Sequence, residues 1–196
     1  LYNILYTSSI LGNNLPVACG VSFANKIKKN KRVTFVITGD GAIEEGAFYE
    51  SLLLAKSLEI PILFIVENNE WSLGTSISER RSDILLNQIC SGLGIKYKKI
   101  LGNNVEQCLS VISVFRKNAL KYSSPMLIEV KLKTLGHWLK KDKEFPKGKF
   151  VNYHAGPITD LNEETNPIIE KKLSDPVFNI FKKLGKNKFT EVVRQQ

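Results

Sequence analysis

Residues 39–76 read GDGAIEEGAFYESLLLAKSLEIPILFIVENNEWSLGTS, and they decide the fold of the chain. They begin where a β-branched run, VTFVI at 33–37, ends, and they contain a second apolar run, ILFIV at 62–66. Between the two runs, residues 46–58 carry apolar side chains with the period of an amphipathic helix. A strand, a helix and a second strand in this order predict a right-handed βαβ unit with parallel strands.

The same alternation extends outward over the first two thirds of the chain. Two more strands are expected at 95–100 and 126–132, and two more helices at 15–27 and 105–120. Apolar strand runs of this kind are typical of a sheet that is covered on both faces. The sequence therefore predicts an α/β fold of three layers, with a mostly parallel sheet and helices on both faces.

The pattern changes after residue 134, where glycines, prolines and charged residues interrupt the periodicity. Asp175 is a plausible N-cap and Pro176 a first helical residue for a later helix at 176–184. Because residue 1 is Leu, we expect the sequence to be a piece of a longer chain. The expected organisation is a core at 1–135, a long loop region at 136–173 and a C-terminal helical segment of the same domain at 174–196.

Composition limits the classes of function. The formal net charge is +9, but the basic residues are scattered and are not interleaved with aromatic residues, so a nucleic-acid partner is not expected. No apolar run approaches the roughly 20 residues that span a bilayer, so no membrane partner is expected. Three widely spaced cysteines form no CxxC pair, which favours inert thiols in a cytoplasmic protein.

A glycine–aspartate–glycine turn stands where the first of these strands ends. Gly39 and Gly41 flank Asp40, and these glycines would let the backbone turn sharply and approach a ligand. Backbone N–H groups leading into the next helix suit a phosphate, and the carboxylate of Asp40 suits Mg²⁺. Asn69 follows the second strand, 69 − 40 = 29 residues after Asp40. Because adjacent parallel strands end at the same edge of a sheet, both residues are expected to meet over one magnesium and diphosphate site.

Two simpler interpretations stay open beside this one. Asp40 is alternatively a turn residue and Asn69 a strand cap. Glu44 and Glu45, in the first turn of the following helix, are interpreted as favourable charges at its positive end.

The spacing of these motifs resembles a known family. GDG at one strand end and NN at the next is similar to the thiamine-diphosphate motif, and VENNEWSLGTS at 66–76 resembles the alpha subunits of pyruvate, branched-chain 2-oxo acid and acetoin dehydrogenases. Three further segments resemble the same family: SSILGNNLPVACGVSFA at 8–24, PMLIEVKLKTLGHW at 125–138 and SDPVFNIFKKL at 174–184.

The resemblance implies a fold and a set of ligands. The fold is the diphosphate-binding half of the thiamine-diphosphate-binding fold, and the cofactors are thiamine diphosphate and Mg²⁺. Asp40 and Asn69 would bind the metal through side chains and Trp71 through its backbone carbonyl. Gly41 and Ala42 would contact the diphosphate through backbone N–H groups, with Gly39 allowing the turn.

Histidine is the implied catalytic residue. His137 matches a loop histidine of the family that lies near the diphosphate and the reactive centre. The family loop HGHS reads LGHW here at 135–138, which removes the first histidine and the serine, so regulation by phosphorylation at that serine is not supported. His154 in NYHAGP is therefore a second candidate for the role of His137.

The implied activity is the oxidative decarboxylation of a 2-oxo acid with transfer of the acyl group to a lipoyl-type acceptor. The resemblance implies a heterotetramer with a beta-type subunit, which supplies the pyrimidine-binding domain and an activating glutamate, and a lipoyl-bearing acyltransferase. Two alternatives stay open, namely transketolase-like or sugar-synthase transfer of two carbons, and a non-catalytic scaffold that keeps the fold.

Overall fold

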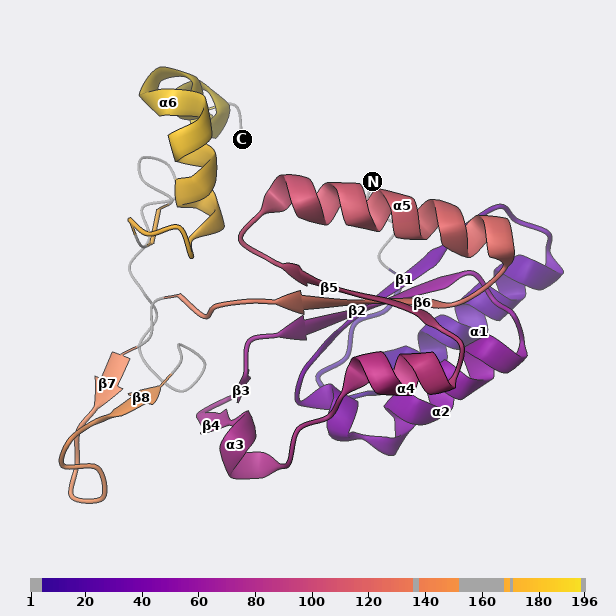
Figure 1. Cartoon of the computed structure of the whole chain (residues 1–196), viewed down its shortest axis with the longest axis horizontal. Helices are drawn as coiled ribbons and strands as arrows, with labels where there is room; N and C mark the ends of the chain where they lie inside the picture. The colour runs from indigo at the N-terminus through magenta and orange to yellow at the C-terminus, as the bar shows by residue number, and fades with distance from the viewer. Residues whose placement is uncertain (1–4, 136–137, 152–167, 170, 195–196) are drawn as a thin grey trace.

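The central element of the chain is a parallel sheet. The computed structural model describes residues 5–135, 138–151, 168–169 and 171–194. Its main sheet has four strands in the order β1-β2-β6-β5, and all three pairings are parallel (Figure 1). The predicted parallel sheet, and the adjacency of the first two strands, are confirmed. The strands are β1 (Thr34–Gly39), β2 (Ile62–Asn68), β5 (Lys96–Leu101) and β6 (Met126–Lys131).

Helices cover both faces of this sheet, so the predicted three layers are confirmed (Figure 1). α1 (Asn14–Ile27), α2 (Gly46–Ser57) and α4 (Leu86–Gly92) pack on one face, and α5 (Val105–Tyr122) packs on the other. Three of these helices were predicted within two residues of their ends. The seven-residue α4 was not predicted, because it is too short for a periodic signal.

β2 contributes buried side chains to two hydrophobic cores. Phe64 and Val66 point into the cluster formed with α1, α2 and α4, whereas Leu63 and Ile65 point into the cluster formed with α5. The alternation follows from the two-residue period of a strand. All four side chains are buried, which accounts for the unbroken apolar run at 62–66.

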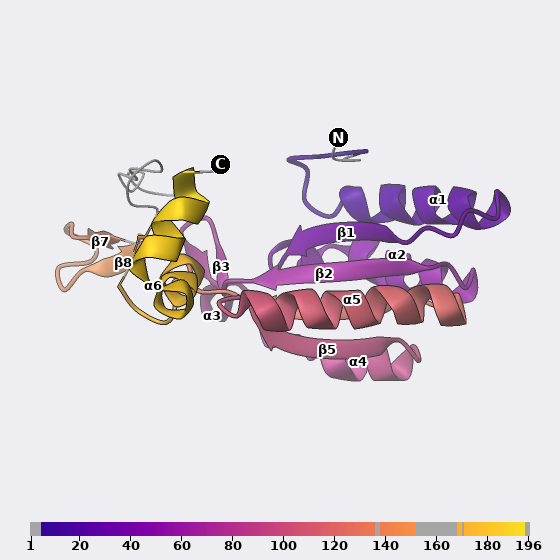
Figure 2. The same cartoon turned by 90° about the horizontal axis from the view of Figure 1, so that it is seen from above.

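The carboxyl ends of β1 and β2 lead into several short elements. Residues after β1 form a 3-10 helix, η1 (Ala42–Glu44). Residues after β2 form a small hairpin of β3 (Trp71–Ser72) and β4 (Thr75–Ser76), followed by α3 (Ile77–Arg80). Figure 2 shows that β3 and α3 lie beyond the end of β2, on the side opposite the loops that enter the strands.

The region after residue 135 contains more order than the expected loop. β7 (Trp138–Lys140) and β8 (Lys149–Val151) form an antiparallel hairpin. α6 (Pro176–Arg194) begins as predicted, because the buried Asp175 accepts the backbone N–H of Val177 at 2.8 Å and of Phe178 at 3.2 Å. The helix extends beyond the predicted end at 184 through a kink at Gly185, whose φ is 73°.

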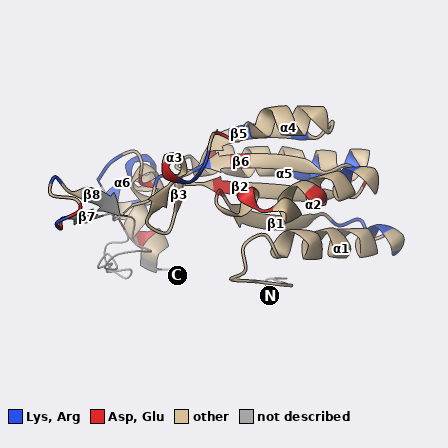
Figure 3. Ribbon diagram, turned by 90° about the horizontal axis from the view of Figure 1, so that it is seen from below, with Lys and Arg blue, Asp and Glu red and all other residues tan. Residues whose placement is uncertain are grey.

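No helix within the described ranges is both long and apolar enough to span a membrane. Lysine and arginine residues are distributed over helices, strands and the β7–β8 hairpin (Figure 3). Acidic residues occur where β2 ends and α2 begins, close to α3, and also on the β7–β8 hairpin and on α6 (Figure 3).

Candidate metal and diphosphate site

Asp40 follows β1 directly and lies at the carboxyl edge of the sheet. Its side chain is only 2% exposed, and its backbone N–H donates to the carbonyl of Glu67 at 3.1 Å. This hydrogen bond continues the β1–β2 ladder, in which Gly39 pairs with Glu67. The ladder therefore fixes Asp40 opposite the end of β2.

Asn69 touches Asp40 through its backbone. The backbone of Asn69 lies close enough to the Asp40 carboxylate to act to lower its pKa. The side-chain Oδ1 of Asn69 accepts the backbone N–H of Trp71 at 3.0 Å, which is the local turn that asparagine commonly forms. The structure thus brings Asp40 and Asn69 together, but the carboxamide of Asn69 serves the β3 hairpin.

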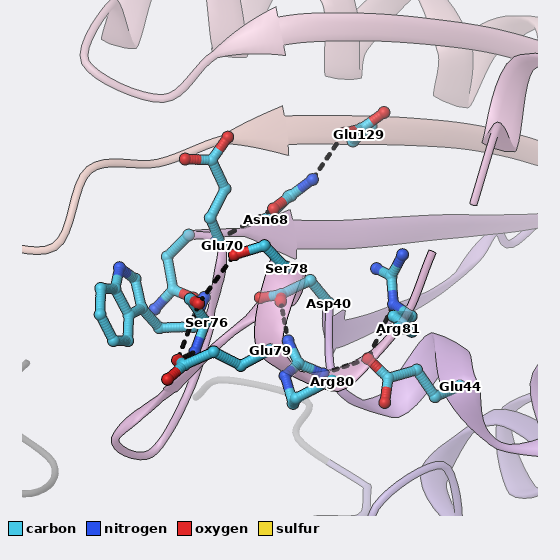
Figure 4. Close-up of polar contacts among 12 residues, drawn as sticks. Asp40, Glu44, Asn68, Glu70, Ser76, Ser78, Glu79, Arg80, Arg81 and Glu129 are labelled. Atoms are coloured by element: carbon cyan, nitrogen blue, oxygen red, sulfur yellow. Dashed lines mark hydrogen bonds and ion pairs between the residues drawn. The ribbon is translucent and has the colours of Figure 1, made fainter. Parts of the chain in front are cut away.

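A guanidinium faces the Asp40 carboxylate. Nη2 of Arg80 lies 2.8 Å from Oδ2 of Asp40, and Nη1 of the same side chain contacts Glu44 (Figure 4). Burial raises the pKa of Asp40 above its ordinary value, and the charge and hydrogen bond of Arg80 counteract part of that rise. A buried carboxylate needs a positive partner. The position beside Asp40 therefore favours a cation, and Asp40 fits the carboxylate ligand of a Mg²⁺ site.

Glu44 is bound on the same side. Its Oε1 also accepts Nε of Arg81 at 2.8 Å. Glu44 was interpreted as a favourable charge at the positive end of the next helix. That interpretation is incomplete, because Glu44 also joins η1 to α3 through ion pairs with Arg80 and Arg81.

The reason for glycine at 39 and 41 differs from the prediction. Neither residue has φ in the left-handed region, and φ of Gly41 is −72°, a value that any residue adopts. The expected turn is present at residues 40–41, but it uses no left-handed φ and so does not itself require glycine. At Gly41 the requirement is space, because a Cβ there would lie 3.1 Å from Oγ of Ser72 and 3.7 Å from Nη1 of Arg80. Gly41 is half-buried, and it leads into the buried Ala42.

A buried carboxylate on β6 holds the end of β2 in place. Glu129 is 5% exposed and accepts Nδ2 of Asn68 at 2.8 Å, the hydroxyl of Tyr97, and Nζ of Lys99 at 2.8 Å. Burial acts to raise the pKa of Glu129, but the hydrogen bonds from these three donors outweigh it and lower the pKa. Oδ1 of Asn68 in turn accepts the backbone N–H of Glu70 at 3.1 Å. The turn that carries Asn69 is therefore fixed from two strands.

Thiol and acidic side chains form no metal-binding cluster among the described residues. Within those ranges no group of three or more His, Cys, Asp or Glu side chains is placed to hold a metal ion. Burial raises the pKa of the Cys19 thiol to about 11 and of the Cys90 thiol to about 12, and Cys108 is half-buried. Cys19 and Cys90 are therefore buried, as predicted, whereas their inertness stays a prediction.

Two predicted residues lie outside the described residues, namely His137 and His154. Their roles stay predictions, as does the metal-binding role of the Trp71 carbonyl. The sequence reasoning missed Arg80 and Arg81. A signal was present, because Ser76 and Glu79 have the spacing of a capping box, and the structure shows that box at the start of α3.

The fold is an α/β domain with a parallel sheet, and its candidate ligand site lies at the carboxyl ends of the strands, where such sheets bind ligands. Its fold is similar to that of transketolase from Leishmania mexicana, with a TM-score of 0.54 and 23% identity over 64% of this chain and 20% of that one. The chain belongs to the dehydrogenase E1 component family, whose model matches residues 2–144.

Two relatives of the chain are named as alpha subunits. The chain is 33% identical over 141 residues to the alpha subunit of mitochondrial 2-oxoisovalerate dehydrogenase from Dictyostelium discoideum, covering 71% of this chain and 32% of that protein. It is 28% identical over 159 residues to the pyruvate dehydrogenase E1 component alpha subunit from Rickettsia bellii, covering 79% and 48%. The chain thus spans between about a third and a half of the length of these two relatives.

Proposed function

We propose that this chain is the diphosphate- and magnesium-binding part of the alpha-type subunit of a thiamine-diphosphate-dependent 2-oxo acid dehydrogenase. One observation carries the proposal: the β1–β2 ladder sets the buried Asp40 beside the backbone of Asn69, at the edge where open parallel sheets bind ligands. Membership of the E1 component family, and relatives named for pyruvate and 2-oxoisovalerate, support the choice of reaction.

The residues at this edge suit both parts of the ligand. The carboxylate of Asp40, the carboxamide of Asn69 and the carbonyl of Trp71 would hold Mg²⁺, which prefers oxygen ligands. For this the Asn69 side chain would exchange its bond to the Trp71 N–H for the ion. Backbone N–H groups of Gly41 and Ala42 would bind the diphosphate, because such groups at the start of a helix suit phosphate.

When bound, thiamine diphosphate supplies a nucleophilic carbon for the 2-oxo carbonyl and an electron sink for the loss of CO₂. The described residues of this chain would bind and orient the cofactor. Asp40 offers a desolvated negative charge, which attracts a cation more strongly than an exposed carboxylate would. Glu129 and Asn68 keep the turn that carries Asn69 in one geometry. His137 remains the predicted group near the reactive centre.

Partners follow from the same proposal. A beta-type subunit would supply the pyrimidine-binding domain and the activating glutamate, giving a heterotetramer, and a lipoyl-bearing acyltransferase would accept the acyl group. We expect the chain alone to bind cofactor weakly and to catalyse nothing.

Reconstitution tests this assignment. The chain is mixed with a beta-type subunit, thiamine diphosphate and Mg²⁺, and the oxidation of pyruvate and branched-chain 2-oxo acids is followed with an artificial electron acceptor. Each component alone serves as the control, and ketose phosphates are tested in parallel. We expect turnover of 2-oxo acids by the mixture only. Turnover of ketose phosphates instead would favour the transketolase-like alternative, and failure of the assembled complex to bind cofactor would favour a scaffold.

A further inference from the structure

The guanidinium of Arg80 lies beside the Asp40 carboxylate, which is proposed to bind the metal ion. Nη2 lies 2.8 Å from Oδ2 of Asp40, and the two side chains are 12% and 2% exposed. The contact joins residues that are 40 positions apart, at the ends of α3 and β1 (Figure 4). Because both groups are largely removed from water, this ion pair is strong compared with a surface pair.

The same guanidinium lies against the turn that is proposed to bind the diphosphate. A Cβ built on Gly41 would be 3.7 Å from Nη1 of Arg80, and the same Nη1 contacts Glu44 in η1. Arg80 therefore spans the two halves of the proposed site, the carboxylate for the metal and the backbone for the diphosphate.

Arg80 is not fully satisfied in this position. Its Nε is buried and has no hydrogen-bond partner among the described residues, although a guanidinium has donors in a fixed fork and buried donors are normally paired. Arg81 is different, because its Nε donates to Glu44 at 2.8 Å and its Nη1 donates to the carbonyl of Ser82 at 3.0 Å. An unpaired buried donor lowers the cost of moving Arg80 out of the site.

The helix that carries Arg80 is also easy to move. α3 has four residues, and none of them is buried. Apart from the ion pairs of Arg80 and Arg81, α3 is held by the capping box of Ser76 and Glu79 and by the Ile77 N–H, which donates to the Glu70 carbonyl at 3.1 Å. These two contacts are local to the helix start. A shift of α3 would therefore expose no core side chain.

We propose that Arg80 is the chain's own counter-cation at this site and that it competes with the divalent metal for Asp40. A metal ion and a guanidinium on one buried carboxylate repel each other, so binding of the ion displaces the Arg80 side chain. Arg80 thus keeps Asp40 neutralised before the metal binds and sets the metal affinity. The inference rests on the proposed function, because it takes Asp40 as a metal ligand.

Metal affinity of two arginine variants tests the proposal. The full chain is titrated with Mn²⁺ alone, and free Mn²⁺ is read by electron paramagnetic resonance. Arg80→Met removes the charge and keeps the apolar stem. Arg81→Met is the matched control, because Arg81 contacts Glu44 and not Asp40. We expect Arg80→Met to raise the Mn²⁺ affinity about tenfold or more, and Arg81→Met to change it by less than about twofold.

The thermal unfolding temperature, Tm, gives a second test of the proposal. Without metal, Arg80→Met should have a lower Tm than the parent chain, because Asp40 loses its partner, and saturating Mn²⁺ should raise its Tm more than that of the parent. If Arg80→Met does not fold, Arg80→Lys is measured instead. A lysine at this position competes less strongly for Asp40, so the Mn²⁺ affinity should still rise. An affinity that is unchanged or lower in the folded Arg80 variant overturns the proposal.

Asp40→Asn separates this inference from the proposed function. If Asp40→Asn abolishes Mn²⁺ binding while the Arg80 variants bind as the parent does, only the role of Arg80 is refuted. If the parent and Arg80→Met bind Mn²⁺ no better than Asp40→Asn, the metal site itself is refuted, and the proposed function with it.

Discussion

Replacing Glu129 with glutamine should destabilise the sheet edge that carries the candidate site. The change keeps the shape of the side chain but removes its charge, and it presents an amide donor to the three donors from Asn68, Tyr97 and Lys99. Lys99 is 51% exposed, so its pair with Glu129 contributes little, at most about 1 kcal/mol. Asn68 and Tyr97 lose charge-assisted bonds, at about 1 kcal/mol each relative to neutral ones. We therefore expect a loss of about 2 kcal/mol in the free energy of unfolding at pH 7.

The loss should depend on pH in a defined direction. The hydrogen bonds to Glu129 outweigh burial and put its folded-state pKa below the unfolded value. The ionised carboxylate therefore stabilises the fold above the unfolded pKa of about 4.3, and this contribution is lost as the pH falls through the lower folded value. The difference between the parent chain and Glu129→Gln should be largest near neutral pH and should shrink below about pH 4.

Urea unfolding at a series of pH values measures both effects, with Glu106→Gln as the control. Glu106 is 74% exposed and pairs with the exposed Lys183, so its variant should differ from the parent by less than about 0.5 kcal/mol. The reasoning is refuted if Glu129→Gln is as stable as the parent at pH 7, or if its deficit is the same at pH 4 as at pH 7.

Three further predictions concern the packing of the described core. Gly102→Ala should lower the free energy of unfolding by about 1–3 kcal/mol, because its Cβ would lie 2.2 Å from Cδ2 of Leu132. Gly20→Ala in α1 should instead raise it by about 0.5–1 kcal/mol, since no described atom beyond the neighbouring residues and the helix's own backbone lies within 4 Å of the added Cβ. Denaturant unfolding of both variants tests the contrast. Burial raises the pKa of the Cys90 thiol to about 12, so this thiol should resist a disulfide reagent at pH 8 in the native chain. It should react once the chain unfolds. Rapid labelling of native Cys90, located by mass spectrometry, would contradict its burial.

The sheet was predictable because its central signal is strong and local. The runs at 33–37 and 62–66 are apolar on both strand faces, and one helix length separates them, so the adjacency of Asp40 and the residues after β2 followed from topology alone. The order of the remaining strands was not predicted. The network of Glu129 depends on that order, because β6 lies between the strands that carry Asn68 and Tyr97.

The short elements around the site could not be predicted from periodicity. β3 and β4 have two residues each, and the turns around them need positive φ at Glu70 and Leu73, which are not glycines. The contact between Arg80 and Asp40 spans 40 residues and leaves no local pattern. The glycine at 41 was correctly singled out, but its reason, space beside Ser72, depends on where the hairpin folds back.

The central claim is that Asp40 anchors a divalent ion that holds a diphosphate. Calorimetric titration of thiamine diphosphate into the assembled complex, with and without Mg²⁺, tests it most directly when the parent is compared with Asp40→Asn. The account predicts Mg²⁺-dependent binding by the parent, and loss of that dependence in a variant whose circular dichroism spectrum is unchanged. Equal Mg²⁺-dependent affinity in the parent and in Asp40→Asn would contradict it.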